Sequence, residues 1–473
     1  MTRIFIGGMC SLPLGTMERQ LGNMAILIPM LKMLQDEMPG VEIVTSLQLS
    51  KEFCKTHDLT SLDIKSLYLP TLKSGMTSIA DWLRSGLWNF LKDKVGLDLK
   101  WLVSGKKFEE LLQSDIILDF SGDTYGDMAH LTHLVKHSLD LLTFLNLNKP
   151  VYIFAQSPGP FSTFFRKQLA RLVLERVTLI TCREHISFET LKALPVKPAP
   201  VFETACPAWL LEPAEPACVK KISLQEQIPL FEKPLVGFNF CGFNVASELI
   251  SRDKYKEQRP DEELAPLVAV LRYLLDELKV NVVMVPHVYR MNLRGEMVPG
   301  PDGKITDQLY NLVIKQLPEY KEKLMVVRGT YPVSEIKAVI GQCDLFVAGR
   351  LHAGVAAMSQ CIPTILLAYG YKHYGFARLA GMEQYVSNNF KGVIHASDII
   401  EKVGLAWKSK GALSGEIARR MVTIRALSDL NAALVKEVVA ACPKGSSRLS
   451  RETIDSLNKM PSTIMLAEQA EER

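Results

Sequence analysis

The chain has 473 residues, of which 48% are hydrophobic and 22% are charged. This length exceeds the ~250–300 residues at which a single hydrophobic core stops growing, so we expect two domains. The composition is that of a globular protein and excludes extensive disorder. The 55 basic and 51 acidic residues leave a net charge of +4, which gives no general affinity for nucleic acid or for an anionic membrane. Any positive charge that serves to bind a ligand must therefore be concentrated at a particular site.

The nine cysteines form no C-x-x-C pair, and some lie in apolar runs, as Cys182 and Cys343 do. An odd number in so large a chain favours buried reduced thiols over a disulfide framework. The N-terminus lacks the basic and apolar regions of a signal peptide, and no window of ~18 uncharged apolar residues is long enough to span a bilayer. We therefore expect a soluble, cytoplasmic protein.

In the first half, short apolar runs typical of strands alternate with helical patterns. The predicted strands are Arg3–Gly8, Val41–Thr45, Asp115–Phe120, Val151–Ala155 and Val177–Thr181. They are continuously apolar, as strands covered on both faces of a parallel sheet should be. The predicted helices between them include Gly22–Met38 and Phe164–Glu175. The stretch Leu59–Lys107 shows amphipathic helical pieces but no clear strand, and we interpret it as an insertion on this first sheet.

A proline-rich stretch, Ala205–Pro216, and the charged residues that follow it up to Pro234 suggest a linker between domains. Beyond it the alternation restarts. The predicted strands are Leu235–Phe240, Val280–Pro286, Leu324–Val327, Asp344–Gly349 and Pro363–Ala368. The predicted helices are Glu262–Leu278, Asp307–Leu317, Ser334–Gln342 and Leu351–Gln360.

This alternation predicts an α/β protein with two domains, each a doubly wound parallel sheet, and a cleft between them. We expect the N-terminal domain at residues 1–215 and the C-terminal domain at 230–410. Residues 411–473 should form a long amphipathic helix, Gly411–Ala441, and a polar tail after Pro443 that is partly disordered.

The segment 343–377 places basic side chains where two strands of the second half end. Arg350 and His352 open a helix whose free N–H groups favour an anion, and Ala353 and Gly354 allow that helix to pack closely. Lys372 follows the next strand. Ligands of parallel α/β sheets bind at the carboxyl ends of strands, so we interpret these residues as a site. The alternative is that Arg350 pairs with a carboxylate and His352 is a core histidine.

This segment resembles the signature of the polysaccharide pyruvyl transferase family, in which Arg-Leu-His follows one strand and a lysine follows the next. Further matching pieces are FSGD (120–123), AQSPGPF (155–161), CREHISFETL (182–191) and TYPVSEIKAVIGQCD (330–344). The resemblance runs over most of residues 1–400. The chain departs from the family pattern at Gln20–Asn23, where Asn-x-Gly-Asp is usual, and at Cys206, where an aspartate is common.

The resemblance implies two Rossmann-like domains of the GT-B type that face each other across a cleft. It also implies transfer of pyruvate from phosphoenolpyruvate to two sugar hydroxyls, which forms a cyclic ketal. Arg183, Arg350 and Lys372 would bind the donor's carboxylate and phosphate. His352 would deliver the proton to the methylene carbon and then act as base, with Arg350 beside it in the catalytic pair. The scheme requires no metal and no cofactor beyond the donor itself.

Other polar residues at strand ends have a functional and a structural interpretation. Gly122, Asp123 and Ser157 lie in turns that suit substrate binding, and Asp123 is equally a turn former. His287 ends a strand, where it is either an acceptor contact or a hydrogen-bonded loop residue. Three further carboxylates lie nearby, Asp115, Asp119 and Asp127, and we expect Asp127 to cap a helix. Three histidines, His130, His133 and His137, recur at helical spacing. They lack a fourth ligand, which favours an ordinary helix face over a metal site.

Two alternatives remain open beside a pyruvyl transferase. One is a GT-B nucleotide-sugar glycosyltransferase or epimerase, and the other is a non-catalytic relative that kept the fold. The partners we expect are phosphoenolpyruvate and a glycan, a lipid-linked sugar or a nucleotide-activated sugar as acceptor. We expect no nucleic acid and at most peripheral membrane contact.

Overall fold

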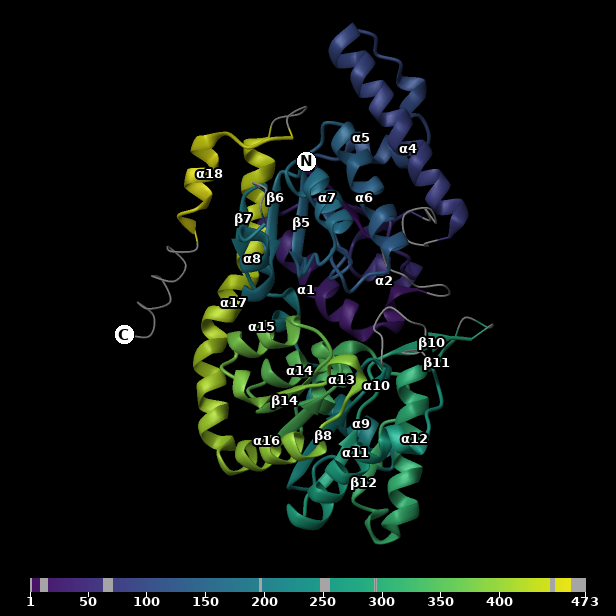
Figure 1. Ribbon diagram of the computed structural model, residues 1–473, viewed down its shortest axis with the longest axis vertical. Coiled ribbons are helices and arrows are strands. Elements are labelled where there is room, and N and C mark those ends of the chain that lie inside the picture. Colours follow the sequence, from purple (N-terminus) through teal and green to yellow (C-terminus); the bar gives the residue numbers. More distant parts are fainter. Residues whose placement is uncertain are drawn as a thin grey trace. The chain divides into compact units, whose positions relative to one another are not determined.

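The computed structural model describes residues 2–8, 16–62, 71–194, 198–246, 256–292, 294, 296–442 and 447–460. The chain divides into two compact units. The first comprises Met1–Met17, Met30–Cys206 and Ala426–Arg473, and the second comprises Glu18–Pro29 and Pro207–Arg425. Two helices contribute residues to both units, α1 (Leu21–Glu37) and α17 (Lys410–Ala441) (Figure 1).

Within the described residues, the first unit contains a parallel sheet of seven strands in the order β3-β2-β1-β4-β5-β6-β7. The strands are β1 (Arg3–Gly7), β2 (Glu42–Thr45), β3 (Leu59–Ser61), β4 (Ile116–Asp119), β5 (Val151–Gln156), β6 (Leu179–Cys182) and β7 (Val201–Glu203). Central β1 pairs with β2 on one side and with β4 on the other, so that Ile4 lies opposite Ile43 and Ile116. All three isoleucines are buried, as expected in a sheet that helices cover on both faces.

The helices of the first unit differ in how many apolar side chains they bury. Besides parts of α1 and α17 they are α2 (Lys51–Thr56), α4 (Leu72–Phe90), α5 (Lys106–Gln113), α6 (Leu131–Asn146), α7 (Phe164–Leu174), α8 (His185–Lys192) and α18 (Arg451–Leu457). A π-helical turn η2 (Leu91–Val95) and a 3-10 turn η3 (Lys100–Val103) follow α4. Phe5 of β1 meets Phe144 of α6 edge to face in the core.

The second unit repeats the same plan. Within the described residues its parallel sheet has six strands in the order β12-β9-β8-β13-β14-β15. The strands are β8 (Leu235–Asn239), β9 (Asn281–Met284), β12 (Leu324–Val326), β13 (Leu345–Ala348), β14 (Thr364–Ala368) and β15 (Val386–Asn388). Counted along the unit, this is the Rossmann strand order 3-2-1-4-5-6. A two-stranded antiparallel hairpin, β10 (Tyr289–Met291) and β11 (Met297–Pro299), follows β9.

Close packing at the centre of the second sheet depends on a glycine. A Cβ at Gly237 of β8 would lie 2.2 Å from Cδ2 of Phe346 on the neighbouring β13, so no larger residue fits here. The helices of this unit are α9 (Pro216–Glu226), α10 (Gly242–Val245), α11 (Asp261–Arg272), α12 (Pro301–Gln316), α13 (Val333–Ile340), α14 (Leu351–Met358), α15 (Lys372–Leu379) and α16 (Ala396–Lys408).

The predicted α/β class is confirmed, and each strand predicted from an apolar run is present with small shifts at its ends. Two predictions about elements were wrong: Leu59–Lys107 does contain a strand, β3, and α12 begins at Pro301 rather than at Asp307. The predicted linker contains a helix, α9, and the strands β7, β10, β11 and β15 were missed. The missed strands have only three residues each, which is too short to establish a period.

Helix α17 has 32 residues, and its second half belongs to the first unit. Asn431 of α17 is fully buried and donates to the carbonyl of Ala205 at 2.9 Å. Its side-chain oxygen accepts from Thr204 Oγ1 at 3.0 Å. Residues 443–446 and 461–473 of the predicted polar tail lie outside the described residues. None of the helices in the described part of the chain is long and apolar enough to cross a membrane.

Replacing Asn431 by alanine should destabilise the first unit. The change leaves the Ala205 carbonyl without its side-chain donor inside the protein, which typically costs about 1–3 kcal/mol of unfolding free energy. Urea denaturation monitored by circular dichroism measures the loss. Glu437→Ala, at an exposed position of the same helix, is the control and should change stability by less than about 0.5 kcal/mol. Equal stability of the two variants would contradict a role for Asn431 in holding α17.

Candidate active site

The second sheet reverses its winding between β8 and β13, and the polar residues of this unit gather at that point. Such a switch point is where open α/β sheets bind ligands. Asn239, the last residue of β8, connects three strand ends there. Its Oδ1 accepts from the backbone N–H of Arg350 at 2.8 Å, and its Nδ2 donates to the carbonyl of Val285 after β9 at 2.6 Å. Asn239 therefore fixes the turn that begins α14.

Arg350 forms a two-pronged ion pair with Asp302, in the first turn of α12. Nε donates to Oδ2 at 2.9 Å and Nη2 donates to Oδ1 at 2.7 Å. The Asp302 side chain is fully buried, whereas 17% of the Arg350 side chain remains exposed. Burial alone would lower the pKa of Arg350, but the adjacent carboxylate raises that pKa above its ordinary value. The guanidinium is thus a fixed cation whose orientation Asp302 sets.

Two stacked aromatic rings connect Arg350 with Lys372. The rings of Phe243 and Tyr369 lie 4.9 Å apart at an angle of 26°. The Arg350 guanidinium lies 5.0 Å from the centre of the Phe243 ring, and the Lys372 ammonium lies 5.7 Å from the centre of the Tyr369 ring. Both cations are within the range of cation–π attraction. The structure therefore brings together the two cations predicted after β13 and β14.

His287 is a buried histidine beside this ion pair. It is 2% exposed, and neither ring nitrogen has a hydrogen-bond partner among the residues that the structure describes. Burial, and secondarily the positive charge of Arg350, lower the pKa of His287 to about 3. The ring is therefore neutral at physiological pH, with one nitrogen able to donate and the other able to accept.

His352 lies in the first turn of α14, where the start of α1 packs directly on it. A Cβ at Gly22 would lie only 2.8 Å from Nδ1 of His352. On another side, the ring meets Phe376 of α15 edge to face, with centroids 6.4 Å apart. Gly22 belongs to Gln20–Asn23, the segment that departs from the family pattern, so this departure adjoins His352.

In the first unit, the predicted residues Arg183, Ser157 and Gly122 lie together at the carboxyl ends of β4, β5 and β6. Arg183 is 2% exposed and its Nε donates to Ser157 Oγ at 2.8 Å. The backbone N–H of Ser157 donates to the carbonyl of Gly122 at 3.0 Å. Gly122 has a φ of +68°, and a Cβ there would meet no atom within 4 Å. Asp123, the next residue, is half-buried in the same turn.

A buried carboxylate, Asp119, holds the polar side chains beneath that turn. Its oxygens accept from Ser121 Oγ at 2.5 Å and from Gln156 Nε2 at 2.8 Å, and lie 3.1 Å from His137 Nε2. His137 is therefore a hydrogen-bonded core histidine. His130 caps α6 with its ring, so the prediction that Asp127 would cap a helix was wrong. Asp127 instead accepts from the backbone N–H of Ser162 at 2.9 Å.

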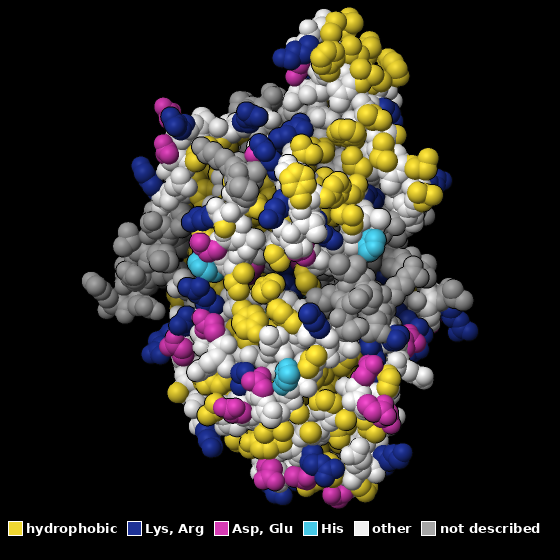
Figure 2. All heavy atoms as spheres, viewed as in Figure 1, with side chains coloured by type: hydrophobic (Ala, Val, Ile, Leu, Met, Phe, Trp, Pro, Cys, Tyr) yellow, Lys and Arg dark blue, Asp and Glu magenta, His cyan; other side chains and the backbone are white. Residues whose placement is uncertain are grey.

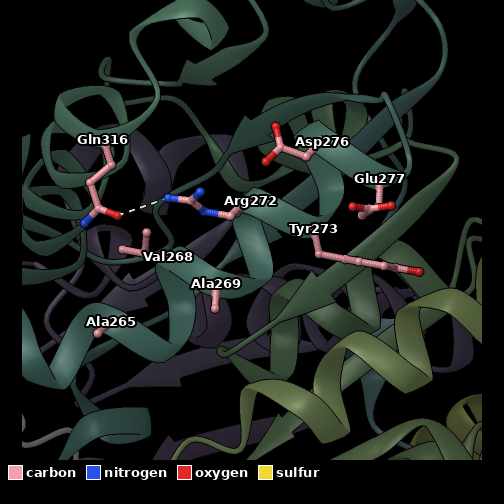
Figure 3. Close-up of a pocket in the computed structure, with 8 residues that line it drawn as sticks. All are labelled: Ala265, Val268, Ala269, Arg272, Tyr273, Asp276, Glu277 and Gln316. Atoms are coloured by element: carbon pink, nitrogen blue, oxygen red, sulfur yellow. Dashed lines mark hydrogen bonds between the residues drawn. The ribbon is translucent and has the colours of Figure 1, made fainter.

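No group of three or more His, Cys, Asp or Glu residues in the described part of the chain is arranged to hold a metal ion. A surface pocket in the second unit also lies away from the polar residues described above. Figure 3 shows that side chains of α11, the following π-helical turn η6 (Tyr273–Glu277) and α12 line it. Arg272 donates to Gln316 across the pocket at 3.4 Å. None of the predicted site residues contributes to it.

Comparison with known proteins shows to which family the chain belongs. The model of the polysaccharide pyruvyl transferase family matches residues 21–371, which include Arg183, Arg350 and His352. The chain belongs to this family. It is therefore a member of a transferase family, as its motifs suggested.

Three proteins similar to this pyruvyl transferase family member show how far the likeness extends. It is 22% identical over 324 residues to the amylovoran biosynthesis protein AmsJ of Erwinia amylovora, covering 68% of this chain and 72% of AmsJ. Its fold is similar to that of Anabaena HepE, solved in complex with UDP (TM-score 0.53, 10% identity, 92% and 100% of the two chains). It is also similar to UDP-GlcNAc 2-epimerase from Neisseria meningitidis (TM-score 0.52, 10% identity, 93% and 100%). The two parallel-sheet units are thus of the GT-B type.

Three polar residues of these sites were missed in the sequence. Asp302 had a signal, because Pro301 followed by an acidic residue is typical of the first turn of a helix. Asn239 and Gln156 each stand at the end of a buried strand, where a polar residue is expected to face a site. What these two bind to could not be predicted, because their partners are 37–111 residues away in the chain.

Asp302→Asn should destabilise the second unit strongly in this pyruvyl transferase family member. Arg350 would keep its charge at a largely buried position without a counter-ion, which typically costs about 3–5 kcal/mol of unfolding free energy. Thermal and urea unfolding measure the change. The matched control is Asp307→Asn on the same helix, whose pair with Arg328 is exposed and should contribute less than about 1 kcal/mol. Similar losses for both variants would contradict the importance of the buried pair.

His287 should make stability depend on pH. Its native-state pKa of about 3 lies below the value near 6.5 of an unfolded chain, so between these values the unfolded state binds one more proton than the native state. The free energy of unfolding should therefore fall by up to about 1.4 kcal/mol per pH unit as the pH decreases through this window.

Urea unfolding between pH 7 and pH 5 tests this pH dependence. The wild type should lose more stability on acidification than His287→Gln. The exposed His395→Gln variant should behave like the wild type. If His287→Gln keeps the full pH dependence, then His287 is not held neutral in the native state.

Proposed function

We propose that this protein transfers pyruvate from phosphoenolpyruvate to two hydroxyls of a sugar, forming a cyclic ketal. The observation that carries the proposal is the group formed by Arg350, Lys372 and His352 at the strand ends of the second unit. An arginine oriented by Asp302 and a lysine nearby suit a small donor with a carboxylate and a phosphate. Membership of the pyruvyl transferase family supports the same donor.

The proposed reaction proceeds in two additions at one carbon. The first sugar hydroxyl attacks C2 of the donor and its proton passes to the donor's phosphate group, which later leaves as hydrogen phosphate, while His352 protonates the methylene carbon C3 to a methyl group. The second hydroxyl then attacks C2, and the bond from C2 to the phosphate oxygen breaks. His352, now neutral, takes the proton of this second hydroxyl, so that the enzyme returns to its starting state. The products are the ketal and inorganic phosphate.

Arg350 and Lys372 would neutralise the donor's negative charges in both steps. Arg183 in the first unit, held by Ser157, is proposed as a further donor contact, and the turn at Gly122 and Asp123 as a substrate contact. His287 is proposed to bind an acceptor hydroxyl. An unpaired buried polar group costs free energy, and a sugar hydroxyl would supply the partner that its ring nitrogens lack among the described residues.

The acceptor is proposed to be a glycan, a lipid-linked sugar or a nucleotide-activated sugar. The relation to AmsJ, an amylovoran biosynthesis protein, favours a role in polysaccharide biosynthesis. Structures of similar fold were solved with UDP and with UDP-GlcNAc, which keeps a nucleotide-activated acceptor among the candidates.

Phosphoenolpyruvate should raise the melting temperature of the protein, whereas nicotinamide and flavin cofactors should not, because only a ligand that binds the native state stabilises it.

His352→Ala should lower turnover by about 10²–10⁴-fold with little change in donor affinity, because a proton donor acts mainly in the transition state. Lys372→Ala and Arg183→Ala should instead weaken donor binding by about 1.5–3 kcal/mol each. Phosphate release and donor titration by calorimetry measure both quantities.

Lys408→Ala, at an exposed position of α16, is the control for loss of a positive charge and should behave like the wild type. Release of UDP from a UDP-sugar without phosphoenolpyruvate would identify a nucleotide-sugar enzyme instead. A His352→Ala protein that folds normally and keeps wild-type phosphate release would overturn the proposed role of His352.

A further inference from the structure

Helix α4 exposes most of its large apolar side chains and buries a row of polar ones, although Trp88 is buried as well. Large hydrophobic residues recur at helical spacing along one side and are 46–85% exposed. This surface, called here the α4 apolar face, consists of Leu72, Met76, Ile79, Leu83, Leu87 and Phe90. Figure 2 shows hydrophobic side chains gathered over this part of the first unit, at the upper right of the view. An ordinary surface helix does the opposite and turns its apolar stripe to the core.

Hydrogen bonds and ion pairs fix the buried side of α4. Ser78 Oγ donates to Asp140 Oδ1 of α6 at 2.8 Å, and Asn146 Nδ2 donates to Ser85 Oγ at 3.2 Å. Asp81 is 5% exposed and pairs with Lys107 at 2.8 Å. Because these partners have specific geometry, α4 cannot rotate to bury its apolar side without breaking them. The apolar side is therefore held outward.

The exposed apolar surface continues into the segment that follows α4. Val95, Leu97 and Trp101 are 50–68% exposed. Exposed lysines stand among them, at positions 92, 94 and 100. An apolar helix face with lysines at its margin and an exposed tryptophan is the composition of helices that lie in the interface of a lipid bilayer.

The charge of this segment differs from that of the rest of the chain. Residues 71–107 contain seven lysines and arginines but only three aspartates, so their net charge of +4 equals that of the whole protein and the remainder is balanced. One of the three, Asp81, is buried in its pair with Lys107. Another, Asp98, accepts from Trp88 Nε1 at 2.9 Å. The exposed charge around the apolar surface is therefore mainly positive.

We propose that the α4 apolar face and the lysines beside it dock this protein on an anionic lipid bilayer. The helix would lie along the membrane surface, with its apolar side chains among the acyl chains near the headgroups and its polar side still bonded to α6. Lys92, Lys94 and Lys100 would contact acidic headgroups. A second copy of the chain fits this surface less well, because the segment offers no exposed acidic patch to receive another copy's lysines.

Vesicle sedimentation tests the apolar contribution. The purified protein should sediment with vesicles of phosphatidylglycerol and phosphatidylcholine, and much less with phosphatidylcholine alone. Leu83→Glu/Leu87→Glu should reduce binding at least about tenfold, since two inserted side chains become charged. The control is Leu172→Glu/Leu405→Glu, which changes leucines that are 54% and 52% exposed on other helices, and it should reduce binding by less than about twofold.

Charge variants test the lysines in the same assay. Each neutralised lysine should lower binding to the anionic vesicles about fivefold, so Lys92→Gln/Lys94→Gln/Lys100→Gln should nearly abolish it. Lys192→Gln/Lys220→Gln/Lys408→Gln removes the same charge at exposed sites elsewhere and should have a much smaller effect. Melting temperatures confirm that every variant is folded, as exposed positions should allow.

Several outcomes would overturn the proposal. These are no sedimentation of the wild type with anionic vesicles, equal losses in the α4 variants and their controls, or a change from dimer to monomer in Leu83→Glu/Leu87→Glu by analytical ultracentrifugation. The last would show that the α4 apolar face joins two copies. The proposal does not depend on the donor chemistry, so phosphate release measured without lipid remains a separate test of function.

Discussion

The candidate site of the second unit depends on the buried ion pair between Asp302 and Arg350. Moving two charges out of water is unfavourable unless their geometry is good, and here two short bonds meet that condition. The pair fixes the guanidinium beside the Phe243 ring and places a positive charge next to His287. Cys241 is buried beside the pair, and burial raises the pKa of its thiol to about 11 although the charge of Arg350 opposes that rise. His287 and Cys241 are therefore both neutral groups next to this one cation.

The two units place polar residues at the same positions of their sheets but use different side chains there. In each, polar residues follow buried strands near the point where the sheet reverses its winding. In the first unit a carboxylate, Asp119, lies underneath and bonds to neutral groups, and Arg183 is oriented by a serine hydroxyl. In the second unit the carboxylate binds the arginine directly. The arginine of the first unit is therefore held by a neutral partner and that of the second by a charged one.

The sequence was sufficient for the elements that have a long apolar run and for the residues that follow them. Strands such as β4 and β13, and the positions of Arg350, Lys372 and Arg183 after strands, follow from local pattern alone. Three-residue strands such as β7 and β15 were not predictable, because three residues are too few to establish an apolar period. The partner of Arg350 was missed for another reason: Asp302 lies 48 residues earlier in the chain, on a helix whose start was misassigned. The outward orientation of the apolar side of α4 could not be predicted either, because the helical spacing of its apolar residues does not show whether they face the core or the solvent.

The course of α17 has a consequence for biosynthesis. Residues from Ala426 onward belong to the first unit, although they are made after every residue of the second. The ribosome therefore releases all the strands of the second sheet before the helix that carries Asn431 exists. We expect the second unit to reach its native packing first, while the N-terminal sheet still lacks the second half of α17. A nascent chain that stops before residue 426 would thus still expose apolar surface of the first unit to chaperones.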